Sequence, residues 1–393
     1  MRIAYVCADQ GVPVFGVKGS SNHVQEVVRG LAAQGAEVEI FAARIGGSPP
    51  PGLEGVAVHR LPRGPHASRE QKERWGLESN VHLRAALGSA GPFDLVYERH
   101  SLWSYAGMEY ARHHHVPGLL EVNSPLLDEQ RRYRELVLER EAAQAVARAF
   151  RAASALMGVS ESVARFLRGH PAVRSPVHVV PNGVDPDRFA PPRVATGEPR
   201  PLCVGFVGTL KPWHAVDDLI DAFAALRCQG GDPRLLIVGD GPQRHTLNMK
   251  VTACGVNHAV EFHGAVAPAE VPPLLASMDI VVAPYPQLAD FYFSPLKLFE
   301  YMAAGRAIVA AAIGQIERLV ADGVTGLLYP PGDTAALATT LSRLMADESL
   351  RHRLGAAARQ VAIRDHTWHA AIHRIFELAE AHSPTRSTTW SAG

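Results

Sequence analysis

Short apolar runs alternate with longer amphipathic segments along the first half of the chain. The apolar runs predict strands at Ile3–Ala8, Glu37–Ala42, Val56–Leu61, Leu95–Glu98, Leu119–Val122, Ala155–Val159 and His178–Val180. Periodic segments between them, such as Asn22–Gln34 and Asp128–Ala153, predict helices. Because strands that alternate with helices form parallel sheets covered on both faces, this half is predicted to be a doubly wound α/β domain.

The pattern stops at a segment rich in proline and charge, and then it restarts. Residues 186–201 (PDRFAPPRVATGEPRP) predict a linker. Beyond it, strands are predicted at Leu202–Val207, Leu235–Val238, Glu261–Phe262, Ile280–Ala283, Ala307–Ala311 and Gly326–Tyr329. Helices are predicted at about 215–228, 242–254, 268–277, 295–304, 314–322, 333–346 and 348–363. The predicted organisation is a domain at 1–185, the linker at 186–201, a second domain at 202–365, a separate helix at 366–382 and a disordered polar tail at 383–393.

Composition limits the classes of function that fit this chain. Hydrophobic residues make up 47% of the 393 residues and charged residues 20%, which is enough apolar material for two cores. Basic and acidic residues balance at 39 each, so no general attraction to nucleic acid or to an anionic membrane is expected. No apolar run reaches the length of a membrane span. We therefore expect a cytoplasmic protein without stable membrane anchoring, either a monomer or a homodimer.

The cysteines and histidines form no recognisable disulfide or metal pattern. The four cysteines are far apart and include no CxxC pair, which favours reduced thiols: Cys7, Cys203, Cys228 and Cys254. None of the 19 histidines lies in an HExxH motif, and His113–His115 are predicted to lie at the exposed end of a helix. The Asp185-Pro-Asp187 motif is interpreted as a turn because of its proline. No metal and no cofactor are expected.

The first strand-to-helix loop contains the glycines expected of an anion-binding loop. It reads DQGVPVFGVKGSSNHVQEV, with Lys18 directly before Gly19 and with Ser20, Ser21 and Asn22 as candidate helix caps. Parallel sheets bind ligands at the carboxyl ends of their strands. A glycine loop that begins a helix there presents backbone N–H groups to an anion. An ordinary loop is the alternative interpretation.

Two loops of the second half have similar features. Residues 207–214 (VGTLKPWH) combine Gly208, which allows close backbone approach, with Lys211 and His214, which could contact a phosphate. Residues 238–242 (VGDGP) end a strand, and Pro242 is predicted at the first helical position. For this second motif a tight turn is the favoured alternative.

The segment DFYFSPLKLFEYMAAG carries the most informative pattern. Ser294 is predicted to cap a helix that has Pro295 at its first position. Lys297 and Glu300 then share one face of that helix, beside an apolar stripe. One interpretation is a solvated face with an ion pair. The other is a ligand face, on which a phosphate lies at the helix N-terminus and the Glu300 carboxylate accepts hydrogen bonds from the hydroxyls of a sugar diol.

These motifs together resemble glycosyltransferase family 4, whose members have the GT-B fold and use nucleotide sugars. The resemblance also rests on Pro181-Asn-Gly-Val-Asp185 and on Thr325–Asp333 (TGLLYPPGD), and it covers nearly the whole chain. It implies two Rossmann-like, doubly wound parallel-sheet domains that face across a cleft. The N-terminal domain would bind the acceptor, the C-terminal domain would bind the nucleotide sugar, and the last helix would return to the N-terminal domain. The family is retaining and, in this fold, independent of metals.

The resemblance assigns candidate roles to individual residues. Glu300 would bind the ribose, and the backbone around Gly264–Val266 would contact the base. The full predicted nucleotide-sugar site is Gly208, Thr209, Lys211, His214, Gly239, Gly241, Gly264, Val266, Ser294, Leu296, Lys297 and Glu300. The predicted catalytic residues are Gly19, His100, Asn123 and Lys297, and the predicted acceptor-binding residues are Asp9, Lys18, Glu98 and Glu121. Alternatives remain for two groups: His100 as a hydrogen-bonded histidine near a strand end, and the acidic residues as caps or solvated loops.

The sequence departs from the family pattern in three places, which involve four positions. Tyr292 stands where the first glutamate of the Glu-x7-Glu motif is expected, and Asp290 is the candidate replacement. Thr209 and His214 occupy the loop that often carries an arginine and a lysine. Asn123 stands in place of the catalytic-loop histidine.

The predicted function is transfer of a hexose or amino-hexose from a nucleotide sugar, UDP being favoured, to a hydroxyl of a small polar acceptor. Several motifs resemble glycosyltransferases of aminoglycoside pathways, which would make the acceptor an aminocyclitol in antibiotic biosynthesis. The first alternative is a glycosyltransferase of cell-surface polysaccharide or glycolipid synthesis. The others are a nucleotide-sugar epimerase or hydrolase, which would need acid–base carboxylates among Asp9, Glu98 and Glu121, and a non-catalytic nucleotide-sugar binder.

Overall fold

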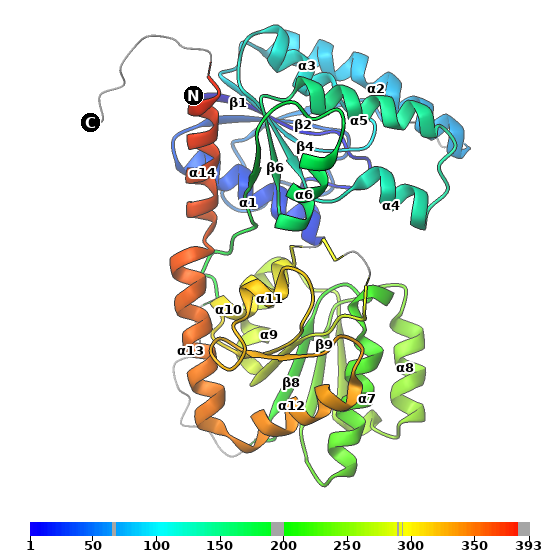
Figure 1. Ribbon diagram of the computed structural model, residues 1–393, viewed down its shortest axis with the longest axis vertical. Helices are drawn as coiled ribbons and strands as arrows, with labels where there is room; N and C mark the ends of the chain where they lie inside the picture. Colours follow the sequence, from blue (N-terminus) through cyan, green and yellow to red (C-terminus); the bar gives the residue numbers. More distant parts are fainter. Residues whose placement is uncertain (65–67, 190–199, 289–290, 293, 384–393) are drawn as a thin grey trace. The chain divides into compact units, whose positions relative to one another are not determined.

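The computed structural model divides the chain into two compact units (Figure 1). It describes residues 1–64, 68–189, 200–288, 291–292 and 294–383. One unit comprises Met1–Asn182, Tyr292–Ser294 and Trp368–Gly393, and the other comprises Gly183–Phe291 and Pro295–Thr367. Asp290, most of the predicted linker and most of the predicted tail lie outside the described residues.

The first unit is built on a seven-stranded parallel sheet with the order β3-β2-β1-β4-β5-β6-β7. Its strands are β1 (Arg2–Cys7), β2 (Glu37–Ala42), β3 (Ala57–Arg60), β4 (Leu95–Arg99), β5 (Gly118–Val122), β6 (Ala155–Gly158) and β7 (Val177–Val179). The strand order reverses direction between β1 and β4, which pair in parallel. In an open α/β sheet, the carboxyl ends of the strands at such a reversal are the usual place for a ligand.

The helices of this unit cover the sheet on both faces. They are α1 (Gly19–Ala33), α2 (Arg69–Ala90), α3 (Ala106–His113), α4 (Leu126–Tyr133), α5 (Glu139–Ala152), α6 (Glu161–Gly169) and, from the end of the chain, α14 (Trp368–Ala381). Helix α14 packs tightly on α1 (Figure 1). A Cβ atom on Gly30 of α1 would lie only 2.6 Å from a side-chain carbon of Ile372.

One predicted helix of this unit is wrong. The sequence predicts a single helix over Asp128–Ala153, whereas the structure has α4 and α5 separated by an extended Arg134. The buried carboxylate of Glu73, on α2, accepts hydrogen bonds from the backbone N–H groups of Val137 (3.0 Å) and Leu138 (2.7 Å). These two hydrogen bonds hold the connection between α4 and α5 in a non-helical conformation.

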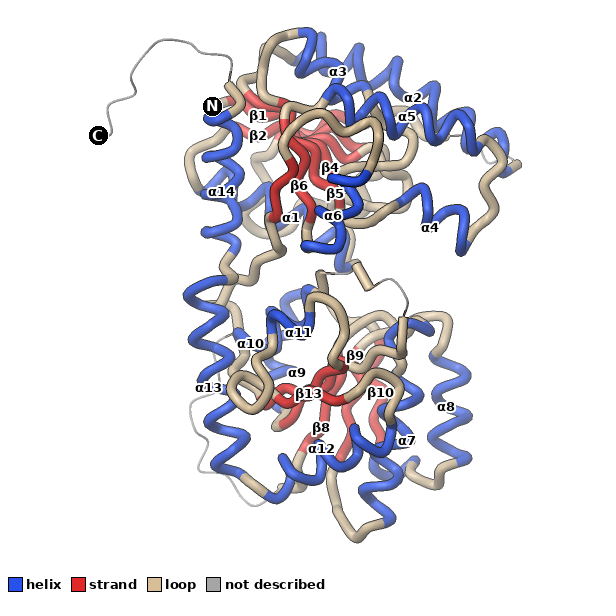
Figure 2. The backbone as a smooth tube through the Cα atoms, viewed as in Figure 1, coloured by secondary structure: helices blue, strands red, loops and turns tan. Residues whose placement is uncertain are grey.

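The second unit has a six-stranded parallel sheet with the order β10-β9-β8-β11-β12-β13. Figure 2 shows strands of this sheet in red among the helices of the unit. The strands are β8 (Cys203–Val207), β9 (Arg234–Val238), β10 (Val260–Gly264), β11 (Ile280–Ala283), β12 (Ala307–Ala311) and β13 (Leu327–Tyr329). The helices are α7 (Val216–Cys228), α8 (Arg244–Ala253), α9 (Val271–Ser277), α10 (Leu296–Ala303), α11 (Ile316–Leu319), α12 (Thr334–Ala346) and α13 (Glu348–Asp365). Each sheet reverses its order once, so the predicted fold class of two Rossmann-like parallel-sheet domains is confirmed.

Three predicted helix starts are wrong. Helix α1 begins at Gly19, with Lys18 at the capping position, so Ser20, Ser21 and Asn22 lie inside it instead of capping it. Helix α10 begins at Leu296 with Pro295 as its capping residue, and Ser294 lies outside. Pro242 lies in a turn two residues before α8.

Three smaller expectations agree with the structure. Cys7 and Cys203 are buried free thiols in strands. His113, the last residue of α3, and the two histidines that follow it are exposed. The Oδ1 atom of Asp185 accepts a hydrogen bond from the backbone of Asp187 at 3.1 Å, as expected for a turn. No helix formed by the described residues combines the length and apolar character that a membrane span requires.

Candidate active site

Lys297 is the central residue of the candidate site in the second unit. It lies in the first turn of α10, which follows β11, and only 9% of the residue is exposed. Its ammonium nitrogen has no hydrogen-bond partner among the described residues. The interpretation of this helix face as solvated is therefore wrong for Lys297, because an unpaired buried ammonium is costly unless a ligand completes it.

Aromatic side chains form the wall around this ammonium. The Lys297 Nζ atom lies 4.2 Å from the ring centroid of Phe206, on β8, and 5.7 Å from that of Tyr285, which follows β11. Burial lowers the pKa of Lys297 from 10.5 to about 7, and the nearby Glu300 only partly opposes this shift. The lysine is therefore held close to the pH at which it loses its charge.

Helix α10 is fixed to the strand beside it by Tyr301. The Tyr301 hydroxyl accepts a hydrogen bond from the backbone N–H of Val207 at 2.8 Å, at the end of β8. Tyr301 is completely buried. This contact holds the first turn of α10, and with it Lys297, at the carboxyl end of β8. Glu300 lies one turn after Lys297 and is half-buried.

Gly208 allows the loop after β8 to approach the lysine closely. Its φ angle is +152°, and a Cβ atom at this position would lie 2.7 Å from the Lys297 Nζ atom. The Gly208 N–H donates to the carbonyl of Val238 at 2.9 Å, which joins this loop to the end of β9. A side chain here would both strain the backbone and displace the ammonium.

The glycines after β9 serve close packing between two loops. A Cβ atom on Gly239 would lie 2.0 Å from the Gly208 carbonyl oxygen, and one on Gly241 would lie 2.4 Å from that of Leu210. The Gly239 N–H donates to the carbonyl of Gly264 at 2.7 Å, so β10 joins the same arrangement. The structure thus brings Gly208, Gly239, Gly241 and Gly264 together, but as a packed set of turns whose N–H groups bond within the protein.

His214 is held inside its loop as a neutral side chain. Its Nδ1 atom forms a hydrogen bond with the carbonyl oxygen of Thr209, and because a carbonyl can only accept, Nδ1 carries the proton. Burial, together with the charges of Lys297 and Lys211, lowers the pKa of His214 to about 3. The remaining ring nitrogen is therefore a hydrogen-bond acceptor, and His214 is not a source of positive charge for a phosphate.

The other predicted residues of the nucleotide site have varied positions. Lys211 is half-buried, with its Nζ atom 5.5 Å from the ring centroid of Trp213. Val266 and Leu296 are half-buried. Ser294 is assigned to the first unit, where its carbonyl accepts a hydrogen bond from Asn182 at 3.1 Å.

A buried polar cluster occupies the carboxyl ends of β4 and β5 in the first unit. Its centre is the Glu121 carboxylate, which accepts hydrogen bonds from the hydroxyl of Tyr97 and the amide of Asn123. Arg99 donates to the same carboxylate at 3.1 Å, and His23 of α1 lies 3.4 Å from it. Although burial alone would raise the pKa of Glu121, His23 and Arg99 outweigh it and lower that pKa.

This cluster orients Asn123, the predicted replacement for the catalytic-loop histidine. Because the Asn123 side-chain nitrogen donates to Glu121, its Oδ1 atom is the group left to accept a further hydrogen bond. His23 is buried, and burial lowers its pKa to about 4. Arg99 donates to its Nδ1 atom at 3.3 Å, so the proton of the neutral ring lies on Nε2, facing Glu121. Sequence reasoning did not single out His23, Arg99 or Tyr97; polar residues at strand ends were the available signal.

The glycine loop after β1 is fixed to its own helix. The Gln25 side chain donates to the carbonyl oxygens of Val14 (3.0 Å) and Gly16 (2.9 Å). Lys18 and Gly19 are exposed at the N-terminus of α1. Asp9 accepts a hydrogen bond from the Gly11 N–H at 2.6 Å, which makes it a turn-forming residue of this loop.

Glu98 was predicted to contact the acceptor, and this prediction is wrong. The residue has no exposed surface, and its carboxylate accepts a hydrogen bond from the Ser104 hydroxyl. Burial raises the pKa of Glu98 to about 7, against the opposing effects of Ser104 and of the Met108 backbone. It is a core residue of β4 whose carboxylate lies against Gly107 in the first turn of α3. The four residues of β4 before Arg99 are all buried, whichever face of the sheet they point to, and the place of Glu98 near a strand end did not indicate this.

Tyr292, at the position of the family's missing glutamate, is engaged within the first unit. Its hydroxyl donates to Glu129 of α4, and its carbonyl accepts a hydrogen bond from Ser160 at 2.9 Å. Within the part of the chain that the structure describes, no three His, Cys, Asp or Glu side chains are placed to hold a metal ion.

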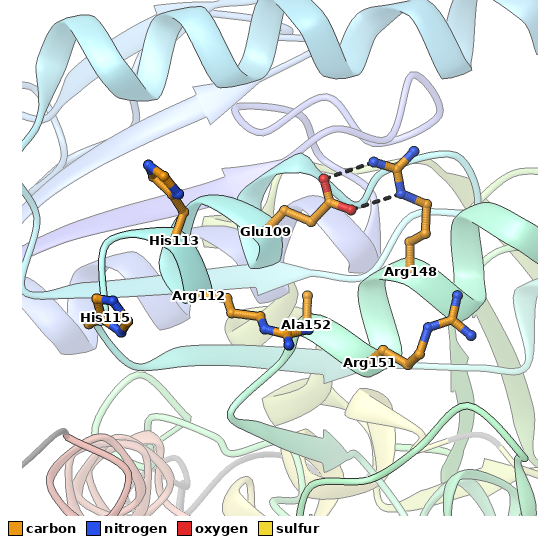
Figure 3. A pocket seen from close by; sticks show the side chains of 7 residues that line it. All are labelled: Glu109, Arg112, His113, His115, Arg148, Arg151 and Ala152. Atoms are coloured by element: carbon orange, nitrogen blue, oxygen red, sulfur yellow. Dashed lines mark hydrogen bonds and ion pairs between the residues drawn. The ribbon is translucent and has the colours of Figure 1, made fainter.

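The first unit also has a wide, charged hollow of about 470 Å³ between α3 and α5 (Figure 3). Glu109 pairs there with Arg148 at 2.8 Å, and Arg112 and Arg151 line the same hollow. Arg112 and Arg151 lie in the last turns of the two helices that precede β5 and β6, so they lie near the amino ends of those strands. That is the edge opposite the one where α/β sheets bind ligands.

Comparison with known proteins identifies the family. Residues 17–188 match the sequence model of Glycosyltransferase Family 4, and residues 201–347 match that of Glycosyl transferases group 1. The D-inositol 3-phosphate glycosyltransferase of Xylanimonas cellulosilytica is 30% identical, over 95% of each chain. The phosphatidyl-myo-inositol mannosyltransferase of Mycobacterium leprae is 32% identical over 203 residues, which are 51% of this chain and 52% of that relative.

A solved structure supports the fold. Anabaena HepE in complex with UDP-glucose superposes with a TM-score of 0.72 over 97% of this chain and all of that one, at 19% identity. The chain therefore belongs to glycosyltransferase family 4, and the resemblance drawn from its motifs is confirmed at that level. Members of this family are glycosyltransferases, and the residues above form the candidate active site of one.

Proposed function

We propose that this protein transfers a hexose or amino-hexose from a nucleotide sugar, with UDP favoured, to a hydroxyl of a small ring-shaped polar acceptor of the cyclitol class. The observation that carries the proposal is the buried ammonium of Lys297 beside Gly208, which has no hydrogen-bond partner in the part of the chain that the structure describes. A phosphate supplies both the negative charge and the acceptor oxygens that such an ammonium lacks.

Lys297 would act on the leaving group. Negative charge grows on the departing nucleoside diphosphate as the sugar is transferred, and a positive group already held in place stabilises that charge most effectively. The first-turn position of Lys297 adds the positive end of α10 to the ammonium. We propose that these two features act in place of a metal ion, with retention of the anomeric configuration.

Glu300 would hold the ribose. A carboxylate one turn behind a phosphate-binding lysine is placed to accept hydrogen bonds from the two ribose hydroxyls. Uridine is favoured because HepE, which shares the fold, is solved with UDP-glucose. Asn123 would accept a hydrogen bond from a sugar or acceptor hydroxyl through Oδ1, in the orientation that Glu121 imposes.

The cyclitol class of acceptor rests on the relatives. The relative that spans 95% of this chain is a D-inositol 3-phosphate glycosyltransferase, and inositol is a cyclitol. An aminocyclitol acceptor of antibiotic biosynthesis remains the narrower form of this proposal. The burial of Glu98 and the pairing of Glu121 leave Asp9 as the remaining acidic candidate for a cationic acceptor.

A second candidate is a glycosyltransferase that makes a cell-surface glycolipid. It is favoured by the phosphatidyl-myo-inositol mannosyltransferase of M. leprae, which is similar to about half of this chain. An epimerase or hydrolase is less favoured, because two of its three candidate carboxylates, Glu98 and Glu121, are buried and bonded within the protein.

Calorimetric titration with UDP, GDP, ADP and dTDP tests the proposal. We expect one nucleotide, UDP, to bind with micromolar Kd and to lose about 10- to 150-fold in affinity in Glu300→Ala, since hydrogen bonds to a charged group are lost. Glu348→Ala, an exposed acid of the same unit, is the matched control and should bind normally. If Glu300→Ala binds UDP as tightly as the wild type, or if no nucleotide binds, the assignment of this site is overturned. If the protein binds the nucleotide sugar but transfers its sugar to no acceptor, it is a non-catalytic nucleotide-sugar binder.

A further inference from the structure

A small enclosed pocket in the first unit is separate from the Glu121 cluster. It has a volume of about 130 Å³. His100 and Ser124, which follow β4 and β5, line the part of the pocket at the carboxyl ends of the strands, where α/β sheets bind ligands. The rest of its lining comes from helices α4, α5 and α6 and from His170 directly after α6, mostly through apolar side chains: Leu126, Leu127, Val146, Phe150 and Phe166.

His100 is the unusual member of this lining. Only 6% of the residue is exposed, and its Nδ1 atom is buried without a hydrogen-bond partner among the described residues. Its ring lies 5.3 Å from that of Phe150. Burial, with the nearby His170 and Arg99, lowers the pKa of His100 to about 4, so the ring is neutral. A buried nitrogen left unpaired costs about 1–3 kcal/mol, and a hydrogen bond from a hydroxyl group would offset this cost.

The size of the pocket limits what can enter. An engineered protein cavity of about 150 Å³ holds a benzene molecule, so this pocket accommodates a group of about six or seven heavy atoms. A hydroxyl suits a neutral histidine in either tautomer, because it both donates and accepts hydrogen bonds.

The charged residues at the pocket neutralise one another. Arg131 donates to Asp128 at 3.2 Å, and both side chains are partly exposed. Deeper in the pocket the walls are apolar, and a charged ligand group would lose its hydration there without gaining an opposite charge.

We propose that this pocket binds an uncharged ring or short alkyl group that carries a hydroxyl, and that this group is part of the acceptor. The claim that this group is part of the acceptor rests on the proposed function, whereas the claim that the pocket binds such a group does not. The proposal makes the pocket selective for acceptor shape and makes His100 a binding residue, in place of the catalytic role predicted from the sequence.

Two pairs of probes of equal size test the chemistry of the pocket. Phenol and toluene differ in the hydroxyl, and cyclohexanol and cyclohexylammonium differ in the charge. Titration of the full chain, followed by calorimetry and by the ring signals of its histidines in NMR, should give a Kd on the order of 1 mM for the two alcohols. Toluene should bind about fivefold more weakly than phenol, and cyclohexylammonium more than tenfold more weakly than cyclohexanol.

Variants locate the binding. Leu127→Trp places a large ring at the pocket and should weaken phenol binding more than tenfold, whereas Leu136→Trp, a half-buried leucine of the same apolar cluster that does not line the pocket, should not. His100→Phe keeps an aromatic ring and should abolish the preference for phenol over toluene. His113→Phe, an exposed histidine of the same unit, is its control.

Each outcome decides the proposal. Failure of both alcohols to bind at 50-fold above the expected Kd, roughly 50 mM, would overturn it, as would unchanged binding in Leu127→Trp or tighter binding of the ammonium probe. UDP titration of the same samples separates the two proposals. If the protein binds UDP but not the alcohols, the proposed function stands and the pocket proposal is overturned. If it binds the alcohols but not UDP, the pocket proposal stands and the proposed function is overturned.

Discussion

At the scale of the residue, the surroundings of Lys297 suit a phosphate-bound ammonium better than a ligand-free one. Lys297 is enclosed by Phe206 and Tyr285, and burial lowers its pKa to about 7. The sequence could place Lys297 in the first turn of a helix, but not reveal its burial. Its aromatic walls come from β8 and from the segment after β11, which are about 80 residues apart in the chain.

The lowered pKa of Lys297 predicts a pH-dependent affinity. Above pH 7 the free lysine is neutral, so binding of a phosphate must take up a proton, and the affinity for UDP should fall by up to about tenfold per pH unit between pH 7.5 and 9. In Lys297→Arg the charge persists and the profile should be flat. Calorimetry in two buffers with different ionisation enthalpies measures the proton uptake. Identical profiles for the two proteins would contradict this role.

The same burial predicts that the lysine destabilises the ligand-free protein. At pH 6, below its lowered pKa, Lys297 is charged and has no hydrogen-bond partner among residues 1–64, 68–189, 200–288, 291–292 and 294–383, so Lys297→Met should raise the free energy of unfolding by about 1–3 kcal/mol. Urea unfolding without ligand measures this change, and Lys250→Met, which breaks an ion pair with Asp221 at 2.5 Å, is the control. A loss of stability in Lys297→Met would mean that the ammonium already has a partner.

At the scale of the element, most strands could be predicted, whereas helix ends could not. The strands at Glu37–Ala42, Ile280–Ala283 and Ala307–Ala311 lie at the predicted residues, because continuous apolar runs are typical of buried parallel strands. The break between α4 and α5 is imposed by Glu73, which comes from another helix. Ser294, a good capping residue by type, lies outside α10 because its backbone bonds Asn182.

The break at α4 and α5 can be tested directly. Glu73→Ala removes the acceptor of two backbone N–H groups and should lower the free energy of unfolding by about 2–3 kcal/mol. Glu70→Ala, one turn away on α2, removes only an exposed ion pair with Arg74 and should change it by less than about 0.5 kcal/mol. Denaturant titration of both variants compares them, and equal losses would refute the role of Glu73.

At the scale of the whole molecule, the order of several weak motifs identified the family where no single motif could. The glycine loops, the Lys297 helix and the TGLLYPPGD segment occur in one sequence order along two α/β halves, and the family match covers both halves. The sequence could not identify which loop glycines pack and which bind, since Gly239 and Gly241 are required by contacts with Gly208 and Leu210. Acceptor residues were least predictable, because Glu98 points into the core.

The central claim is that Lys297 is the anchor for the phosphates of a nucleotide sugar. Titration of UDP into the wild type and into Lys297→Met at pH 7 tests it most directly. The account predicts micromolar binding to the wild type and a loss of about 10- to 150-fold in the variant, whose fold should be at least as stable. Equal affinity for UDP in the two proteins would contradict it.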